Sequence, residues 1–289
     1  MKDTRVPLSS GKKITLSDND YVISGEPIGR GASCLVYEAE KQGELGHRVI
    51  IKEFYPLDYE NCIERGEDGL TLTFTRRQSL IEKRKEQFKC GAAEQVAFYD
   101  KDTNHRLGFP IVAEANGTAY MIVDLSHGQT LVHCRDKLSL CDIAQVMQSL
   151  CNAVSVIHES EKPYLDIKLD NIFVFDKDVA YRIGLFDFDT VLANNKAVLD
   201  ESLGVVSKYW SPPEQRTWKT GEIGTMTDVF AIGAVFYWLI SGKEASDSWL
   251  RDVDERIQSD ILKLKFPRKI VTTLVVRPQT PLKFLCVQM

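Results

Sequence analysis

Two short stretches carry residues whose types and spacing could handle phosphate groups or protons. In the first, IGRGASCLVYEAE at residues 28–40, Gly29 and Gly31 precede a strand-like run. A dinucleotide-binding loop would open a helix there and carry an acid about 20 residues on, but Lys52 lies near that spacing. Two strands joined by a glycine turn, with a lysine on the next strand, would provide a flap over phosphates and a cation to hold them. By itself, Lys52 could equally be a solvated strand lysine.

The second stretch, YLDIKLDNIFVF at residues 164–175, places Asp166, Lys168 and Asn171 just before an apolar run. Asp and Asn are also ordinary turn residues. These polar groups alone therefore fit a loop that enters a strand as well as a chemical site, and the rest of the chain must decide.

Composition and charge narrow the function classes. The 289 residues carry a net charge of −5 with a pI near 5.7 and no long basic run, which argues against nucleic-acid binding. The N-terminus lacks the apolar segment of a signal peptide, and the longest apolar run, residues 229–240, is too short to span a bilayer. We therefore expect a soluble, cytoplasmic protein without a membrane partner.

The seven cysteines are scattered and include no C-x-x-C pair. This pattern argues against a disulfide framework and a structural zinc site, and it fits a reducing compartment.

Strand signals dominate the first third of the chain. Asp68-Gly69 indicates a tight hairpin turn, and the polar stretch 77–98 predicts a helix. Short β-branched or aromatic runs, separated by Gly, Asp or Asn clusters, predict strands at residues 21–23, 35–39, 48–53, 70–74 and 119–125.

Helical periodicity replaces the strand signals after residue 130. Ser139 followed by Asp142 resembles a capping box, and the apolar stripe after it predicts a helix that ends near His158. A second helix over residues 227–241 is apolar on nearly all sides, so we expect it at the centre of its part of the molecule.

In this order, the segments resemble the motifs of the protein-kinase family over about residues 21–242. The correspondence, in chain order, is Gly29-Arg30-Gly31 with Val36 for the glycine-rich loop, 49–52 (VIIK) for V-A-I-K, 164–171 (YLDIKLDN) for H-R-D-L-K-x-x-N, 187–189 (DFD) for D-F-G, Pro213-Glu214 for the end of A-P-E, and Asp228 at the start of a large buried helix. Each motif is moderately specific, and their ordered co-occurrence carries the resemblance.

The resemblance implies an α+β, two-lobed protein-kinase-like fold, with a small β-rich N-lobe and a larger, mainly helical C-lobe. The expected domains are an N-terminal extension at 1–20, an N-lobe at 21–125 with an inserted hairpin at about 55–75, and a C-lobe at 126–289 that is short at its end. A regulatory partner could complete that end. Arg268 and Arg277 are both candidates to pair with Glu214.

The resemblance also implies roles in ATP binding. Lys52 would hold the α- and β-phosphates and would itself be held by a glutamate of the 77–98 helix. Glu82, Glu86 and Glu94 are available, and Glu94 is favoured because its surroundings resemble the family's run from this helix into the next strand.

The nucleotide itself would lie between the glycine-rich loop and a hinge. Gly29, Gly31 and Val36 would cover it, while the hinge at Asp124 and Ser126 would meet the adenine through backbone groups, after Val123 at the gatekeeper position.

For the transfer step, the resemblance implies that Asp166 accepts the proton of a substrate hydroxyl and Lys168 steadies the transferred phosphate. Asn171 and Asp187 would ligate Mg²⁺ through hard oxygens. A lysine two residues after the Asp is typical of Ser/Thr kinases, so the expected cofactors are ATP and Mg²⁺ and the expected partner is a protein with a Ser or Thr.

The sequence departs from the family pattern at several positions. Cys34 replaces the third loop glycine and would add bulk near the phosphates, while Tyr164 replaces a structural His. Asp189 replaces the Gly of D-F-G and could disfavour a backbone flip or alter metal affinity. Val206 stands at the position of a threonine that contacts the catalytic Asp, and Ser207 beside it could take over that contact.

The leading interpretation is an active Ser/Thr protein kinase. Two alternatives stay open on the sequence: a kinase-fold pseudokinase or scaffold that binds nucleotide with little turnover, and, with less support, a small-molecule kinase. Lys168 and the Pro-Glu-Gln segment at 213–215 favour a protein kinase over the latter.

Overall fold

The computed structural model describes residues 3–57, 62–108, 110–124, 128–175, 180–191, 207, 209–217 and 223–244. The chain forms two compact units. Unit 1 contains Met1–His127 and Asp187–Asp189, and unit 2 contains Gly128–Phe186 and Thr190–Met289. The expected tail pairing of Glu214 with Arg268 or Arg277 falls outside the described residues.

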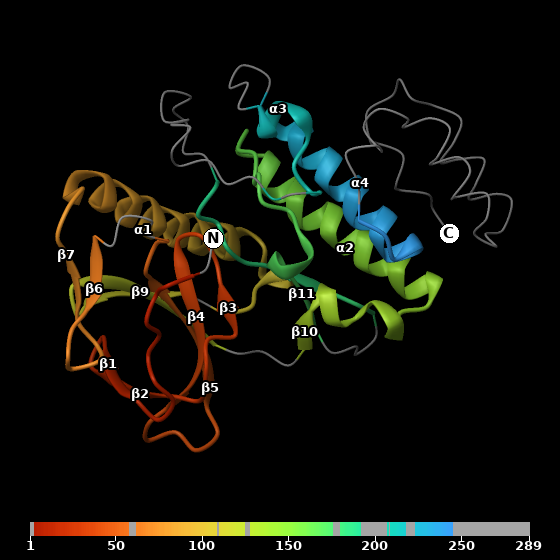
Figure 1. The fold of residues 1–289 in the computed structure, drawn as a ribbon. Helices are drawn as coiled ribbons and strands as arrows, with labels where there is room; N and C mark the ends of the chain where they lie inside the picture. The colour runs from red at the N-terminus through yellow and green to blue at the C-terminus, as the bar shows by residue number, and fades with distance from the viewer. Residues whose placement is uncertain are drawn as a thin grey trace, which may run out of the picture. The chain divides into compact units, whose positions relative to one another are not determined.

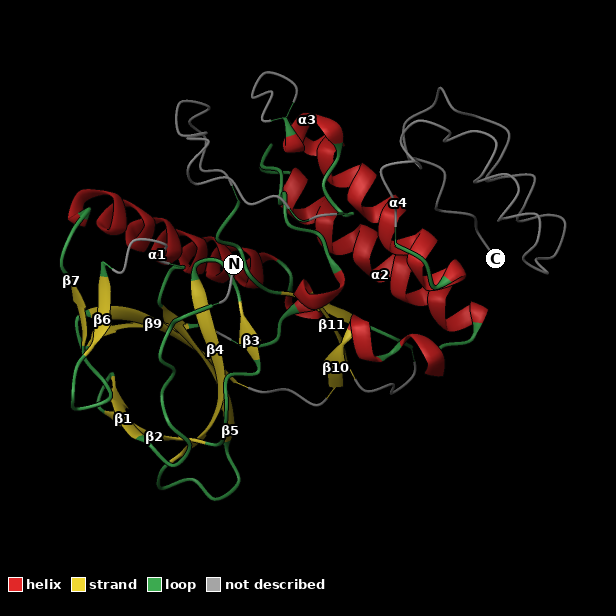
Figure 2. Ribbon diagram, viewed as in Figure 1, coloured by secondary structure: helices red, strands yellow, loops and turns green. Residues whose placement is uncertain are grey.

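Unit 1 is built on a curled antiparallel sheet of seven strands in the order β1-β2-β4-β5-β9-β8, with β3 paired to β4 (Figures 1 and 2). Side chains alternate between core and surface along β4, as expected for a strand with one buried face. The predicted strands are confirmed. The strands of this sheet are β1 (Lys13–Leu16), β2 (Asn19–Ile23), β3 (Gly29–Arg30), β4 (Cys34–Lys41), β5 (Arg48–Phe54), β8 (Ile111–Ala115) and β9 (Thr118–Asp124).

The sheet begins earlier than the expected domain boundary at residue 21. Strand β1 pairs with β2, with Ile14 opposite Tyr21. Leu8, Ile14 and Leu16 are buried in the core of unit 1. Much of the expected extension at 1–20 is therefore part of the sheet, because its apolar residues complete the core.

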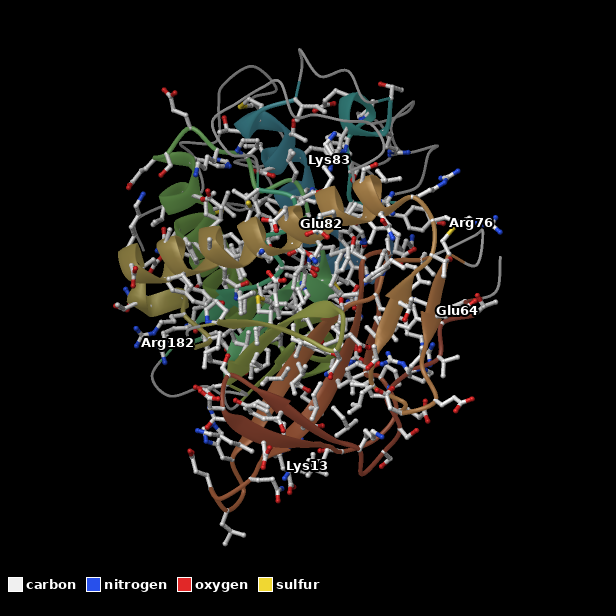
Figure 3. All side chains as sticks on the ribbon, turned by 90° about the vertical axis from the view of Figure 1, so that its left-hand side faces the viewer. Lys13, Glu64, Arg76, Glu82, Lys83 and Arg182 are labelled. Atoms are coloured by element: carbon white, nitrogen blue, oxygen red, sulfur yellow. The ribbon has the colours of Figure 1, made fainter. Side chains whose placement is uncertain are left out.

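Helix α1 (Gln78–Lys101) packs against β8 and β9 and confirms the predicted helix (Figure 1). Phe88 and Ala92 are buried in the core, where the Phe88 ring lies 5.8 Å from that of Phe54. Glu82 and Lys83 lie on the outer surface of the helix (Figure 3). The apolar face of α1 thus covers the sheet while its charged face meets solvent.

The inserted hairpin consists of β6 (Ile63–Arg65) and β7 (Leu72–Phe74). Its existence confirms the prediction, but the loop spans residues 66–71 rather than a tight two-residue turn, because Arg65 pairs directly with Leu72. The Asp68 carboxylate accepts the N–H groups of Leu70 and Thr71, which stabilises the wider loop.

A buried ionic network that the sequence analysis did not predict ties this hairpin to the sheet. Glu53 is fully buried on β5 and accepts a hydrogen bond from Arg65 at 2.6 Å. The hydroxyls of Tyr37 and Tyr120 donate to the same carboxylate at 3.0 and 3.2 Å. Because every donor is fixed by a strand, the buried charge is paired and hydrogen-bonded.

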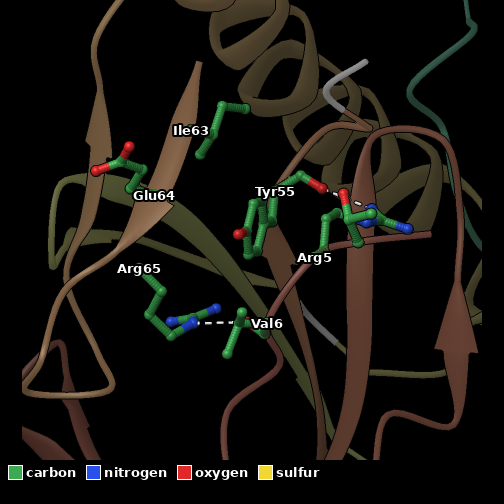
Figure 4. A pocket seen from close by; sticks show the side chains of 7 residues that line it. Arg5, Val6, Tyr55, Ile63, Glu64 and Arg65 are labelled. Atoms are coloured by element: carbon green, nitrogen blue, oxygen red, sulfur yellow. Dashed lines mark hydrogen bonds between the residues drawn. The ribbon is translucent and has the colours of Figure 1, made fainter. Parts of the chain in front are cut away.

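The N-terminal segment also contacts the hairpin, around a cavity of about 320 Å³ (Figure 4). The Arg65 guanidinium donates to the Val6 carbonyl at 2.7 Å, and Arg5 donates to the Tyr55 carbonyl at 2.6 Å. The segment is therefore held to unit 1 by side-chain to backbone hydrogen bonds.

In unit 2, helices α2 (Leu140–His158) and α4 (Thr225–Ser241) lie side by side (Figure 1). Both confirm predicted helices, and Ser139 and Asp142 form the predicted capping box. The other elements are the short helix α3 (Pro213–Arg216) and a three-stranded sheet of β10 (Gly128–Thr130), β11 (Ile172–Phe175) and β12 (Ile183–Leu185).

Helix α2 has the length and hydropathy of a membrane span, the one such helix among the described residues. Its apolar side chains, among them Val146, Leu150 and Val154, are buried against the rest of unit 2. This amphipathic pattern is what a core helix of a globular domain shows, and it passes the same test of length and composition.

Candidate active site

The glycine turn and Lys52 lie together on three adjacent strands. Gly29 pairs with Val36 across β3 and β4, and Val36 pairs with Lys52 across β4 and β5. Residues directly opposite one another share a face of the sheet. The Gly31 N–H donates to the Cys34 carbonyl at 3.0 Å and closes the turn. The strand, turn and lysine arrangement expected from the sequence is present.

Cys34 does not add bulk at the loop surface. Its side chain is 4% exposed and belongs to the hydrophobic core of unit 1. Burial raises the pKa of the thiol well above its ordinary value, so the thiol stays neutral. A cysteine here acts as a small core residue, which explains how the loop tolerates the loss of the third glycine.

Lys52 is buried between two carboxylates. Its Nζ lies 2.9 Å from Asp187 Oδ1 and 3.5 Å from Asp189 Oδ2, and 5.7 Å from the centroid of the Phe88 ring. Burial alone would lower the pKa of Lys52, but the two carboxylates raise it above its ordinary value. The side chain is therefore a fixed cation.

The expected pairing of Lys52 with Glu94 is not the one that the structure has. Among the described residues, the ion pairs of Lys52 run to Asp187 and Asp189. Glu94 lies half-buried on α1, and Glu82 and Glu86 are exposed.

The reason for the different partner lies in α1. A Cβ added at Gly91 would lie 2.7 Å from Asp189 Cα, so the space beside the helix is occupied by Asp189. The aspartate that replaces the D-F-G glycine supplies the carboxylate that the sequence assigned to a helix glutamate.

The segment Asp187–Asp189 is held against α1 by packing and by a hydrogen bond. Phe188 is 1% exposed, and its ring lies 5.3 Å from that of Phe98 and 6.5 Å from that of Tyr99. Gln87 Nε2 donates to the Asp189 carbonyl at 3.0 Å. Burial raises the pKa of the Asp189 carboxyl above its usual range, and Lys52 opposes this shift.

In unit 2, three donors converge on the Asp166 carboxylate, which is 4% exposed. Lys168 Nζ donates to Oδ2 at 2.7 Å and Asn171 Nδ2 to the same oxygen at 2.8 Å. Ser207 Oγ donates to Oδ1 at 2.8 Å. The expectation that Ser207 takes over the contact of the missing threonine is confirmed, while Val206 lies outside the described residues.

Asp228 fixes the backbone that carries Asp166. It is 1% exposed and accepts the N–H groups of Tyr164 and Leu165 at 2.7 Å each, with His158 Nε2 at 2.8 Å. Leu165 adopts a φ of +67°, a conformation that is costly for a non-glycine residue. The buried carboxylate provides the hydrogen bonds that hold this strained residue.

The remaining departures have structural roles in unit 2. Tyr164 is fully buried, and its hydroxyl donates to the Phe186 carbonyl, as an aromatic replacement for a structural His should. Gln215 Nε2 donates to the Leu165 carbonyl at 2.7 Å, and Glu214 accepts from the Thr227 hydroxyl at 3.4 Å. The Pro-Glu-Gln segment thus supports the loop that bears Asp166.

At the expected hinge, Asp124 is the last residue of β9, and His47 Nε2 bonds its carboxylate at 2.8 Å. Its side chain is therefore engaged by His47, and the hinge role of its backbone stays a prediction. Ser126 lies outside the described residues.

Each unit contributes an oxygen donor of the kind that Mg²⁺ prefers. In unit 1 this is the Asp187 carboxylate, and in unit 2 it is the Asn171 amide oxygen, because the Asn171 amide nitrogen is already turned toward Asp166. Within the described residues, no group of three or more His, Cys, Asp or Glu could hold a metal on its own. Mg²⁺ commonly uses one or two protein oxygens together with phosphate oxygens.

Comparison with known proteins gives a consistent result. A family model described as protein kinase domain matches residues 98–280. The chain is 30% identical over 246 residues to a probable serine/threonine-protein kinase, PknB, of Bifidobacterium longum, which covers 82% of this chain and 32% of that protein. A probable serine/threonine-protein kinase of Clostridium acetobutylicum is 26% identical over 238 residues, covering 81% and 32%. The chain therefore spans about a third of the length of these relatives.

A solved structure, the apo form of PpkA-294, matches with a TM-score of 0.64 and 24% identity over 93% of this chain and 91% of that one. This likeness confirms the expected α+β kinase fold. With the family match over more than half of its residues and the motif residues in their expected elements, the chain belongs to the protein kinase family.

Proposed function

We propose that this chain is a Ser/Thr protein kinase that transfers the γ-phosphoryl group of ATP to a protein hydroxyl, with Mg²⁺ as its cofactor. The convergence of Lys168, Asn171 and Ser207 on the Asp166 carboxylate is the observation that supports this most directly. A carboxylate fixed by three donors is a positioned proton acceptor, whereas an unused loop has no need of them.

In the proposed transfer the protein forms no covalent bond to the phosphoryl group and acts by positioning the reactants and stabilising charge. The substrate oxygen attacks the γ-phosphorus, the bond to the β-γ bridging oxygen breaks, and ADP leaves as the hydroxyl proton passes to Asp166. Lys168 would hold the transferred phosphoryl group, and Lys52 the α- and β-phosphates. When bound by Asn171 and Asp187, Mg²⁺ would neutralise charge on the phosphates.

The protein substrate, rather than a small molecule, is proposed from the Pro-Glu-Gln segment and from Lys168. Gln215 bonds the Leu165 carbonyl, which couples that segment to the loop bearing Asp166. A cytoplasmic location is proposed as well, since the seven cysteines are scattered along the sequence and include no C-x-x-C pair.

The test is transfer of radiolabelled phosphate from Mg-ATP to the chain itself and to a generic Ser/Thr substrate. Wild-type protein should incorporate label, and Asp187→Ala should lose it. Asp170→Ala is a matched control, because Asp170 is exposed and should keep wild-type activity.

Equal incorporation by Asp187→Ala and wild type would contradict the metal assignment. If no label is incorporated but Mg-ATP protects the chain against melting, it is a nucleotide-binding pseudokinase or scaffold.

A further inference from the structure

We propose that Asp189 is the positioning residue for Lys52, and that Gly91 on α1 is the site that admits it. The inference rests on the proposed function in one respect, that Lys52 holds the phosphates of ATP. In this proposal Asp189 orients Lys52. Helix α1 provides the close packing surface against which Asp189 lies, and it does not provide the carboxylate.

The contact with α1 is closer than any side chain would permit. A Cβ at Gly91 would lie 2.7 Å from Asp189 Cα, 2.8 Å from its backbone nitrogen and 2.8 Å from Oδ1. Real Cβ atoms are not found this close to backbone atoms, so any other residue at 91 would push Asp189 away. Gln87, one turn earlier, holds the Asp189 carbonyl at 3.0 Å.

The positions of Asp187 and Asp189 around Lys52 allow one of them to bind a metal ion and the other to orient the lysine. Asp187 and Asp189 both face the Lys52 ammonium, at 2.9 and 3.5 Å, so two carboxyl groups share one cation. If Asp187 serves the cation, Asp189 is the carboxylate that keeps Lys52 in place. Without Asp189, a single carboxylate would have to serve both the metal and the lysine.

Because Lys52 and Asp189 are largely buried, loss of their contact should have a measurable effect. The side chains of Lys52 and Asp189 are 7% and 17% exposed. A buried ammonium that loses a partner is strongly penalised, whereas a solvated one is compensated by water. Loss of the Asp189 carboxylate should therefore disturb the orientation of Lys52 rather than only the local packing.

The activity test is a carboxylate swap. Asp189→Gly should lower kcat at least tenfold and change the KM for ATP less than threefold, because Lys52 remains present but is no longer oriented. The matched variant is Asp189→Glu, which keeps a carboxylate on the same backbone position and leaves Gly91 unchanged. Asp189→Glu should keep at least a third of the wild-type kcat.

Wild-type kcat in Asp189→Gly would overturn the proposal. An Asp189→Glu variant that melts like wild type but has no more activity than Asp189→Gly would overturn it as well, because a carboxylate at position 189 would then have no positioning role.

A second measurement does not depend on turnover. The melting-temperature shifts of Lys52→Met and Asp189→Asn should fail to add in the double variant, because each change removes the same ion pair. The matched control is Lys52→Met with Glu82→Gln, whose shifts should add, since Glu82 is exposed on the outer surface of α1.

Additive shifts for Lys52 and Asp189 would refute the pair. If the shifts of the Lys52 and Asp189 variants fail to add but the wild-type chain transfers no phosphate, the ion pair is supported and the proposed function is overturned instead.

Discussion

Unit 2 gives one carboxylate three donors, whereas unit 1 gives two carboxylates one ammonium. Asp166 accepts hydrogen bonds from Lys168, Asn171 and Ser207, and its charge is balanced by the lysine. In unit 1, Lys52 is shared by Asp187 and Asp189.

The difference indicates that the charge of the Asp166 carboxylate is balanced within the protein, whereas the two carboxyl groups of the Lys52 cluster share one cation. In the loop of unit 2 the Asp166 charge is compensated by Lys168, and the loop backbone is fixed by the buried Asp228. The cluster of unit 1 places two carboxyl groups around one ammonium in a partly buried place, and a divalent cation bound there would favour their ionised forms. Unit 1 should therefore respond to cations and to loss of its lysine more strongly than the loop of unit 2 responds to loss of its acid.

The largest expected effect comes from Lys52→Met compared with Asp166→Asn. Both should lower turnover about 100-fold or more, because each removes a group that stabilises charge in the transfer step. Lys52→Met should also cost about 3 kcal/mol of unfolding free energy, since it leaves two partly buried carboxyl groups without their cation.

Asp166→Asn should cost about 1 kcal/mol and leave ATP binding intact, because the amide oxygen still accepts from Lys168 and Asn171 and the amide NH2 can donate to Ser207 Oγ. Urea unfolding and nucleotide titration measure the two differences. Equal stability losses in the two variants would break the contrast between a charged cluster and a balanced loop.

Next in size is Asp228→Ala. The change leaves three donors, the Tyr164 and Leu165 N–H groups and His158, without their buried acceptor. We expect a loss of about 3 kcal/mol in unfolding free energy, together with loss of turnover as the strained Leu165 relaxes. The exposed Asp170→Ala should show no measurable shift by the same urea titration. A fully active Asp228→Ala would show that the loop is not held by this carboxylate.

The smallest effect is a comparison of two helix glycines. Gly91→Ala should cost about 1–3 kcal/mol, because its Cβ meets the Asp189 backbone. In α4, a Cβ at Gly233 meets nothing within 4 Å, so Gly233→Ala should gain up to about 1 kcal/mol of helix propensity. Thermal unfolding of both variants checks the signs. A stabilising Gly91→Ala would mean that α1 and Asp189 are not in close contact.

Local patterns were sufficient for most elements. The β-branched and aromatic runs that became β4, β5 and β9 and the 3.6-period stripe of α2 carry their own signal, because residue type favours strands and a helix imposes its spacing directly. The capping box at Ser139 is equally local. The wide loop of the inserted hairpin was missed, because the choice between two and six residues depends on which strand residues pair.

Sequence by itself determined the family and the order of its motifs, and it singled out Lys52, Asp166, Lys168, Asn171 and Asp187 as candidates, because these inferences depend on residue type and spacing along the chain. Tertiary structure decided the partners. Glu94 and Asp189 are both carboxylates, and only the close approach of α1 at Gly91 determines that Asp189 pairs with Lys52.

Tertiary structure likewise placed the Cys34 side chain in the core of unit 1 and brought Ser207 into hydrogen-bond contact with Asp166. Such contacts join residues far apart in the sequence, and packing selects among chemically similar candidates that no local pattern can distinguish.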